Sequence, residues 1–172
     1  MPSDANGNDG YLSVYNDGSN GSMNQFVAIT GMPLAGYYTV TFEFDIWADL
    51  VNGTVAAPRF YLRTYTAGGS PFNVFDCFAN GNIQVAGKSL GTLTTERSHV
   101  KIELTIAPDG TATAVGQLDD GEAVTSTFSC PNKGVSELTN AQFYFGSKTV
   151  VDVDGTEVAP KIYLDNINIT AQ

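Results

Sequence analysis

The sequence predicts an all-β protein made of two packed antiparallel sheets. Strand-like runs recur about every ten residues, and turn-forming sequences such as Asn80-Gly81 and Pro108-Asp109-Gly110 separate them. No stretch shows the sustained apolar period of 3.6 residues that an amphipathic helix requires. Short strands joined by tight turns stack as a β-sandwich.

We expect eleven strands in a single domain that covers residues 1–172. A chain of this length buries a substantial core without cross-links. The expected strands are Tyr11–Tyr15, Gln25–Thr30, Tyr37–Ala48, Arg59–Thr66, Phe72–Ala79, Asn82–Ala86, Ser98–Ala107, Thr111–Gln117, Glu122–Ser129, Ala141–Gly146 and Lys161–Thr170. The longest segments without a strand pattern are Asp49–Pro58 and Pro131–Asn140.

The third expected strand, Tyr37–Ala48, alternates between two kinds of side chain. Successive side chains of a strand point to opposite sides of a sheet. The apolar phase contains Val40, Phe42, Phe44 and Ile46. The other phase contains Glu43, Asp45 and Trp47. The apolar phase therefore belongs in the core, and the polar phase faces outward.

The fourth expected strand, Arg59–Thr66, has the same two-sided design. Phe60 and Leu62 form its apolar phase. The opposite phase contains Arg59, Tyr61, Arg63 and Tyr65. If both strands belong to one sheet, their outer sides combine flat aromatic rings with carboxylates and guanidinium groups. Such rings stack on sugar rings and such polar groups bond hydroxyls, so the pattern indicates a carbohydrate-binding face.

Two later segments support the same architecture. Ser98–Ala107 alternates strictly, and Thr111–Gln117 returns after a turn, which predicts a hairpin. In Ala141–Gly146 the phenylalanines occupy the apolar phase, so Gln142 and Tyr144 face outward and extend the predicted site.

Composition excludes several kinds of partner. The formal net charge is −10, with 18 Asp plus Glu against only 8 Lys plus Arg. Nucleic acid demands a basic surface, and anionic membranes attract one, so we expect neither partner. No apolar run approaches the ~20 residues of a membrane-spanning helix.

The two cysteines, Cys77 and Cys130, have no CxxC spacing and no adjacent histidine. This excludes a typical thiol metal site. They form either a disulfide or two small buried side chains, and we expect free thiols.

One segment resembles a catalytic strand. Residues 43–48 are similar to the Glu-x-Asp-x-x-Glu strand of family 16 glycoside hydrolases, but Ala48 stands where that family has its acid/base Glu. Glycoside hydrolysis takes two carboxyl groups. We therefore expect that the chain is not an enzyme.

Two other catalytic readings are weaker still. The chain has a single histidine, His99, but no Gly-x-Ser-x-Gly motif that would supply a serine nucleophile for it to activate. A polysaccharide lyase would use a cluster of Arg, Lys, His and Tyr, which Arg59, Tyr61 and Arg63 match only in part.

The closing strand carries a more extensive resemblance. In residues 163–169 the apolar phase shifts between Leu164 and Ile167, which predicts a bulge at Asp165-Asn166. This strand resembles the last strand of non-catalytic carbohydrate-binding modules of the jelly-roll, concanavalin-like type, and residues 11–170 are similar to them in strand order and turn spacing. The resemblance implies one structural calcium ion held by Asp165, with either Asp9 or the Asp4–Gly10 loop as its partner.

The sequence therefore predicts a jelly-roll carbohydrate-binding module that binds plant cell-wall polysaccharide without catalysis. The predicted ligand residues are Glu43, Asp45, Trp47, Arg59, Tyr61, Arg63, Tyr65, Gln142 and Tyr144. Two acids and two arginines would leave this face roughly neutral, which favours a β-1,4-linked glycan such as xylan or β-glucan. The resemblance further implies an extracellular bacterial protein tethered to a catalytic domain. A hydrolase or lyase domain and a structural or adhesive cell-surface sandwich are the alternatives.

Overall fold

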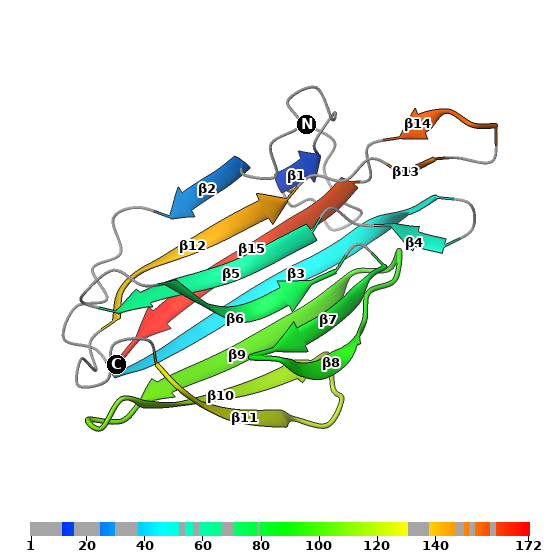
Figure 1. Cartoon of the computed structure of the whole chain (residues 1–172). Coiled ribbons are helices and arrows are strands. Elements are labelled where there is room, and N and C mark those ends of the chain that lie inside the picture. Colours follow the sequence, from blue (N-terminus) through cyan, green and yellow to red (C-terminus); the bar gives the residue numbers. More distant parts are fainter. Residues whose placement is uncertain are drawn as a thin grey trace.

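The computed structural model consists, in the residues it describes, of β-strands stacked as two antiparallel sheets (Figure 1). These residues are 12–15, 25–29, 38–51, 54–56, 59–66, 71–78, 80–130, 138–146, 150–151, 154–158 and 161–172. Within them there are fifteen strands and no helix, and hence no helix able to span a membrane. The predicted jelly-roll β-sandwich is confirmed.

The first sheet, sheet A, has the strand order β1-β15-β3-β9-β10-β11, and the short β4 pairs with β3 alone. Its strands are β1 (Leu12–Tyr15), β3 (Thr39–Val51), β4 (Thr54–Ala56), β9 (Ser98–Ile106), β10 (Thr111–Leu118), β11 (Val124–Ser129) and β15 (Lys161–Ala171).

The second sheet, sheet B, has the order β2-β12-β5-β6-β7-β8. Its strands are β2 (Gln25–Ile29), β5 (Arg59–Thr66), β6 (Pro71–Cys77), β7 (Asn82–Val85), β8 (Lys88–Thr92) and β12 (Leu138–Gly146). A separate hairpin pairs β13 (Val150–Val151) with β14 (Glu157–Val158).

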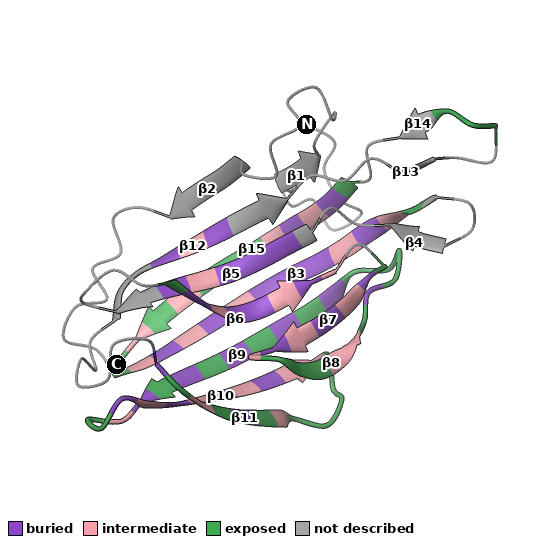
Figure 2. Ribbon diagram, in the orientation of Figure 1, coloured by how far each residue is buried: buried purple, intermediate pink, exposed green. Residues whose placement is uncertain are grey.

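The core lies between the two sheets and is rich in phenylalanine. The expected apolar phases of β3 and β5 are fully buried, and the alternation along β3 and β9 is visible in Figure 2. Phe44 of sheet A makes edge-to-face contacts with Phe60, Phe75 and Phe143 of sheet B, at centroid distances of 6.2, 5.4 and 5.8 Å. These aromatic pairs fix how the sheets face each other.

Strands β3 and β5 lie in different sheets, which corrects the assumption of a shared outer face. Both have one fully apolar side, and Phe44 meets Phe60 across the core instead of beside it. Their outward phases consequently point in opposite directions. The residues expected to form one carbohydrate-binding face are split between the two surfaces of the sandwich.

Several local features confirm the sequence patterns. The β9–β10 hairpin turns at Gly110, which has a φ of 81°, and the backbone N–H of Thr111 donates to Oδ1 of Asp109 at 2.8 Å. That hydrogen bond lowers the pKa of the Asp109 carboxyl. The predicted bulge is also present, because the register between β15 and β3 shifts between Asp165 and Asn168, and Asn166 has a φ of 49°.

The sequence patterns did not predict four of the strands. Strand β8 follows a tight turn at Ala86-Gly87, where both residues have positive φ, 43° and 82°. Hairpin turns of this type usually contain Asn or Asp with Gly, so the alanine hides the signal. Strands β4, β13 and β14 are only two or three residues long, too short to show alternation.

The two sheets close against each other along one side. Strand β10 turns the small residues Ala112, Ala114 and Gly116 inward, and a Cβ on Gly116 would lie 2.6 Å from the side chain of Val85. At the same side, the Lys88 ammonium donates to the Thr125 carbonyl at 2.8 Å, and Oγ of Ser126 donates to the Ala86 carbonyl at 2.8 Å. Strands β8 and β11 are thus tied to one another.

Both cysteines are free and buried, as expected. Burial, with a smaller contribution from the negative charge of Asp76, raises the pKa of Cys77 to about 12. In the unfolded chain the thiol ionises near its ordinary pKa of 9.0, so above this pH the unfolded state loses a proton that the folded state keeps.

We therefore expect alkaline pH to destabilise the fold through Cys77. Stability should fall progressively between pH 9 and about 12. Urea denaturation at several alkaline pH values should show a shallower decline in Cys77→Ala than in the wild type. Equal slopes would contradict the assignment. Native protein at neutral pH should also resist thiol reagents until it unfolds.

Candidate functional site

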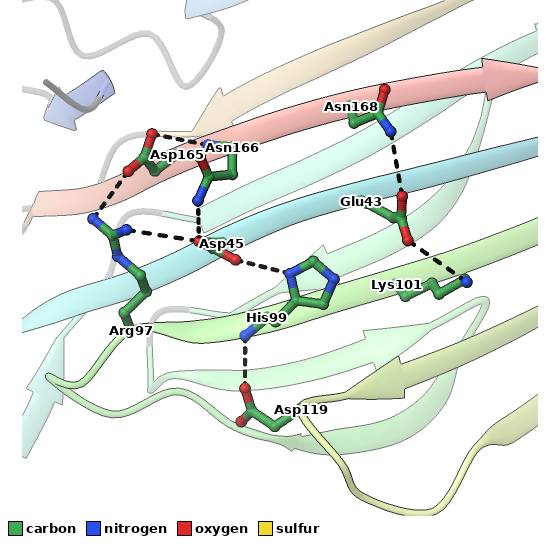
Figure 3. Close-up of polar contacts among 9 residues, drawn as sticks. All are labelled: Glu43, Asp45, Arg97, His99, Lys101, Asp119, Asp165, Asn166 and Asn168. Atoms are coloured by element: carbon green, nitrogen blue, oxygen red, sulfur yellow. Dashed lines mark hydrogen bonds and ion pairs between the residues drawn. The ribbon is translucent and has the colours of Figure 1, made fainter. Parts of the chain in front are cut away.

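The outer face of sheet A carries a polar network centred on Asp45 (Figure 3). Asp45 is largely buried, with 8% of the residue exposed, although it lies on the outward phase of β3. Nδ1 of His99 lies 2.8 Å from its Oδ1, and the Asn166 amide donates to its Oδ2 at 2.7 Å. The bulge in β15 places Asn166 here. His99, the single histidine of the sequence, is therefore one half of a His–Asp pair.

Arg97 extends this network toward β15. Its Nη2 forms an ion pair with Oδ2 of Asp165 at 2.9 Å, and its Nη1 lies 3.8 Å from Oδ2 of Asp45. The guanidinium thus balances two carboxylates that are opposite each other in the sheet register. A second, more exposed chain runs beside it, in which Glu43 is paired with Lys101 at 3.6 Å and accepts from Asn168 at 3.3 Å.

Trp47 lies on the same face, and its ring is covered on both sides. Tyr163 of β15 stacks on it with a centroid distance of 5.3 Å and an interplanar angle of 12°. Arg97, just before β9, places its Cζ 4.7 Å from the ring centroid. Strands β15 and β9 flank β3 on opposite sides. A sugar ring could stack on Trp47 only if one neighbour moved.

Loss of the Asp45 carboxylate should destabilise the protein measurably. Asp45→Ala leaves His99 and Asn166 without their acceptor, which should lower the free energy of unfolding by about 1–3 kcal/mol. Glu43→Ala is the matched control on the same strand, because its exposed pair contributes less than about 1 kcal/mol. Urea denaturation of both variants tests this, and equal losses would refute a special role for Asp45.

The described residues do not favour the expected calcium ion. Both oxygens of Asp165 are engaged, Oδ2 by Arg97 and Oδ1 by the backbone N–H of Asn166 at 2.8 Å. In the part of the chain that the structure describes, no group of three or more His, Cys, Asp or Glu could hold a metal ion. Asp9 lies outside the described residues, so calcium binding stays a prediction, to be checked by melting curves with and without EDTA.

The outer face of sheet B carries a different constellation, centred on Arg63. Nε of Arg63 donates to Oδ1 of Asn73 at 2.8 Å, and the Asn73 amide donates to Oδ1 of Asp76 at 2.8 Å. Cζ of Arg63 lies 5.1 Å from the centroid of the Tyr61 ring. This chain of contacts holds the guanidinium in one orientation. Gln142 is the partner of Arg63 on β12.

The strand register gives the positions of the remaining residues that were predicted for this surface. Tyr144 is the register partner of Tyr61, and Arg59 and Tyr65 lie on β5 in the same phase as Arg63. Sheet B thus gathers the basic, phenolic and amide positions. Glu43, Asp45 and Trp47 belong to sheet A, so the charge balance that favoured a neutral glycan does not apply to a single face.

Sequence reasoning missed Asn73, Asp76 and Arg97. Asn73 and Asp76 flank a register shift between β5 and β6. This irregularity lets their side chains form a hydrogen bond with each other. Asn73 and Asp76 had a detectable signal, because they are the two polar residues of an otherwise apolar strand. Arg97 precedes its strand, and no periodic pattern could place it.

Comparison with known proteins supports the fold. No protein-family model matches the chain, and no curated protein sequence does. Three solved structures that share the fold are alginate lyases. The PL-14 alginate lyase from Aplysia kurodai has a TM-score of 0.52 at 10% identity, covering 94% of this chain and 83% of that one. Alginate lyase Aly36B has a TM-score of 0.54 at 13% identity, covering 94% and 80%.

The third is a family 7 alginate lyase, A1-II′, solved with a bound substrate. It has a TM-score of 0.52 at 14% identity and covers 99% of this chain and 80% of its own. Aly36B has also been solved with alginate trisaccharide. Similarity at this level of identity establishes the jelly-roll sandwich that all these proteins share.

These neighbours overturn the expectation that the chain is not an enzyme, because the three solved structures described above share its fold and are enzymes. The expectation depended on Ala48, which removes the second carboxyl group of a hydrolase. Elimination chemistry does not use a carboxylate pair, so Ala48 does not exclude it. The expected attachment to a separate catalytic domain stays a prediction.

Proposed function

We propose that this protein is a polysaccharide lyase that cleaves a uronate-containing polymer by β-elimination on the outer face of sheet B. One observation carries the proposal: the guanidinium of Arg63 is fixed by Asn73 beside the ring of Tyr61. A positioned cation and a phenol are the two groups that this reaction needs most. The alginate lyases with the same fold support the proposal.

The chemistry assigns each group a task. A uronate carboxylate docks on Arg63, whose fork of donors matches it, with Gln142 as a neighbouring amide. A tyrosine in its phenolate form takes the proton from C5, and the electron pair of that bond forms the C4=C5 double bond. The C4–O glycosidic bond breaks, and a tyrosine hydroxyl protonates the departing oxygen. The candidate tyrosines are Tyr61, Tyr65 and Tyr144.

Arg63 stabilises the charge that develops during this reaction. When the C5 proton leaves, negative charge spreads onto the carboxylate, and a cation fixed beforehand lowers the energy of this state without having to reorganise. The link from Asp76 through Asn73 supplies the fixed orientation. Polymers are too large to enter a cell, so the proposal includes an extracellular location.

The test is a screen of acidic polymers by ultraviolet absorbance, which detects the conjugated double bond. Polymannuronate, polyguluronate, polygalacturonate and hyaluronate are the substrates, and xylan and β-glucan are controls without a carboxylate. We expect absorbance to rise with at least one uronate polymer and with neither control. New reducing ends without absorbance would indicate hydrolysis, and no cleavage of any uronate polymer would refute the proposal.

A further inference from the structure

The outer face of sheet A has a small pocket outside the Asp45 network. It lies between β9 and β10, encloses about 130 Å³, and is open to solvent. Its lining residues are Lys101, Glu103, Val115, Gln117 and Ala123. In the register of the hairpin, Lys101 pairs with Gln117 and Glu103 pairs with Val115, so two outward rows form its walls.

The lining combines a small apolar surface with oriented polar groups. Val115 and Ala123 supply the apolar part. Nε2 of Gln117 donates to the Gly121 carbonyl at 3.0 Å, which fixes the amide against the β10–β11 turn. The Lys101 ammonium is held 3.6 Å from Glu43. The carboxylate of Glu103 is exposed and, among the described residues, has no hydrogen bond or ion pair, so its oxygens are available to accept from the hydroxyls of a ligand.

We propose that this pocket binds a single neutral sugar residue of a glycan, as a second carbohydrate site on the surface opposite Arg63. A sugar ring has an apolar C–H face for Val115 and Ala123 and a rim of hydroxyls. Two adjacent hydroxyls donate to the Glu103 carboxylate, in charge-assisted hydrogen bonds. Lys101 and Gln117 bond a third hydroxyl.

Size and charge select the ligand class. Pockets for drug-sized ligands measure roughly 300–1,000 Å³, so this one takes one ring and not a chain. Glu43 already balances Lys101, and the unpaired carboxylate of Glu103 repels a second carboxylate. The pocket therefore favours a neutral sugar, whereas the Arg63 face is proposed for uronates.

Titration of isotope-labelled protein with neutral tetrasaccharides of xylose, glucose or mannose tests the site by NMR. We expect one of them to shift the amide signals of 101–103, 115–117 and 121–123. Glu103→Gln should weaken this binding about tenfold. The matched control, Glu96→Gln, makes the same change on a loop outside the pocket and should bind normally.

The proposal fails if no neutral sugar shifts these signals at concentrations on the order of 10 mM, or if Glu103→Gln binds as tightly as wild type. Arg63→Ala should leave the shifts intact, and Glu103→Gln should leave uronate cleavage intact. Failure of this site is thus distinguishable from failure of the proposed lyase activity.

Discussion

Replacing Arg63 by alanine should lower kcat/KM for the cleaved uronate polymer by about 10²–10³-fold. This is the effect of removing one preorganised donor from an active site. The guanidinium is held by Asn73 and lies over Tyr61, so it is aligned before substrate binds. Initial rates from the absorbance of the unsaturated product measure the loss. Arg63→Lys should recover only part of it, because an ammonium keeps the charge but not the planar fork.

A matched control separates this effect from a general loss of positive charge. Arg97→Ala removes the same kind of side chain from the opposite surface, where it pairs with Asp165. Its activity should stay within about twofold of wild type. The interaction between solvent-exposed charges decays over roughly 8 Å at physiological ionic strength, so a charge on the far surface of the sandwich has little effect at Arg63. If Arg97→Ala lost as much activity as Arg63→Ala, the active face would have to be assigned to sheet A.

Truncation of Phe44 should be the most destabilising single change in the described core. Phe44 is fully buried, and its ring contacts three others, Phe60, Phe75 and Phe143, across the sandwich. Phe44→Ala should lower the free energy of unfolding by about 3–5 kcal/mol, through lost burial and the cavity it leaves. Because a domain has only about 5–15 kcal/mol in total, part of the population should unfold at moderate temperature.

Denaturant titration at constant temperature measures this loss. Thr41→Ala is the control on the same strand, because its side chain points outward, and it should change stability by no more than about 0.5 kcal/mol. A cost below about 1 kcal/mol for Phe44→Ala would mean that the rings can repack around the cavity.

The sequence predicts individual strands better than it predicts their partners. Alternation along β3 and β9 correctly identified the apolar side chains that are buried, but it did not predict the burial of Asp45 on the outward phase of β3. The bulge at Asp165-Asn166 was also predicted correctly, because it shifts the alternation of apolar and polar residues within one strand. Alternation does not reveal which sheet receives each strand. Two strands with the same pattern pack side by side or face to face, and β3 and β5 adopt the second arrangement.

The candidate sites show the same limit. Arg63 and Tyr61 were selected from their outward phase, and the structure brings them together with Asn73. The pairing of His99 with Asp45 was not foreseen, because it depends on β9 lying next to β3. The wrong expectation about catalysis had a chemical cause: Ala48 removes the second carboxyl group that hydrolysis needs, but elimination does not need that group.

The ties between β8 and β11 bear on how the protein behaves at high concentration. Each of these strands is the last in its sheet, and unpaired edge strands invite other chains to add on, which leads to aggregation. Here Lys88 places a charge at one edge and occupies a main-chain acceptor of the other. The opposite edges, β1 and β2, are only four and five residues long. Within the described residues, neither side of the sandwich therefore offers a long free edge, so this part of the protein is a poor template for intermolecular β-sheet growth.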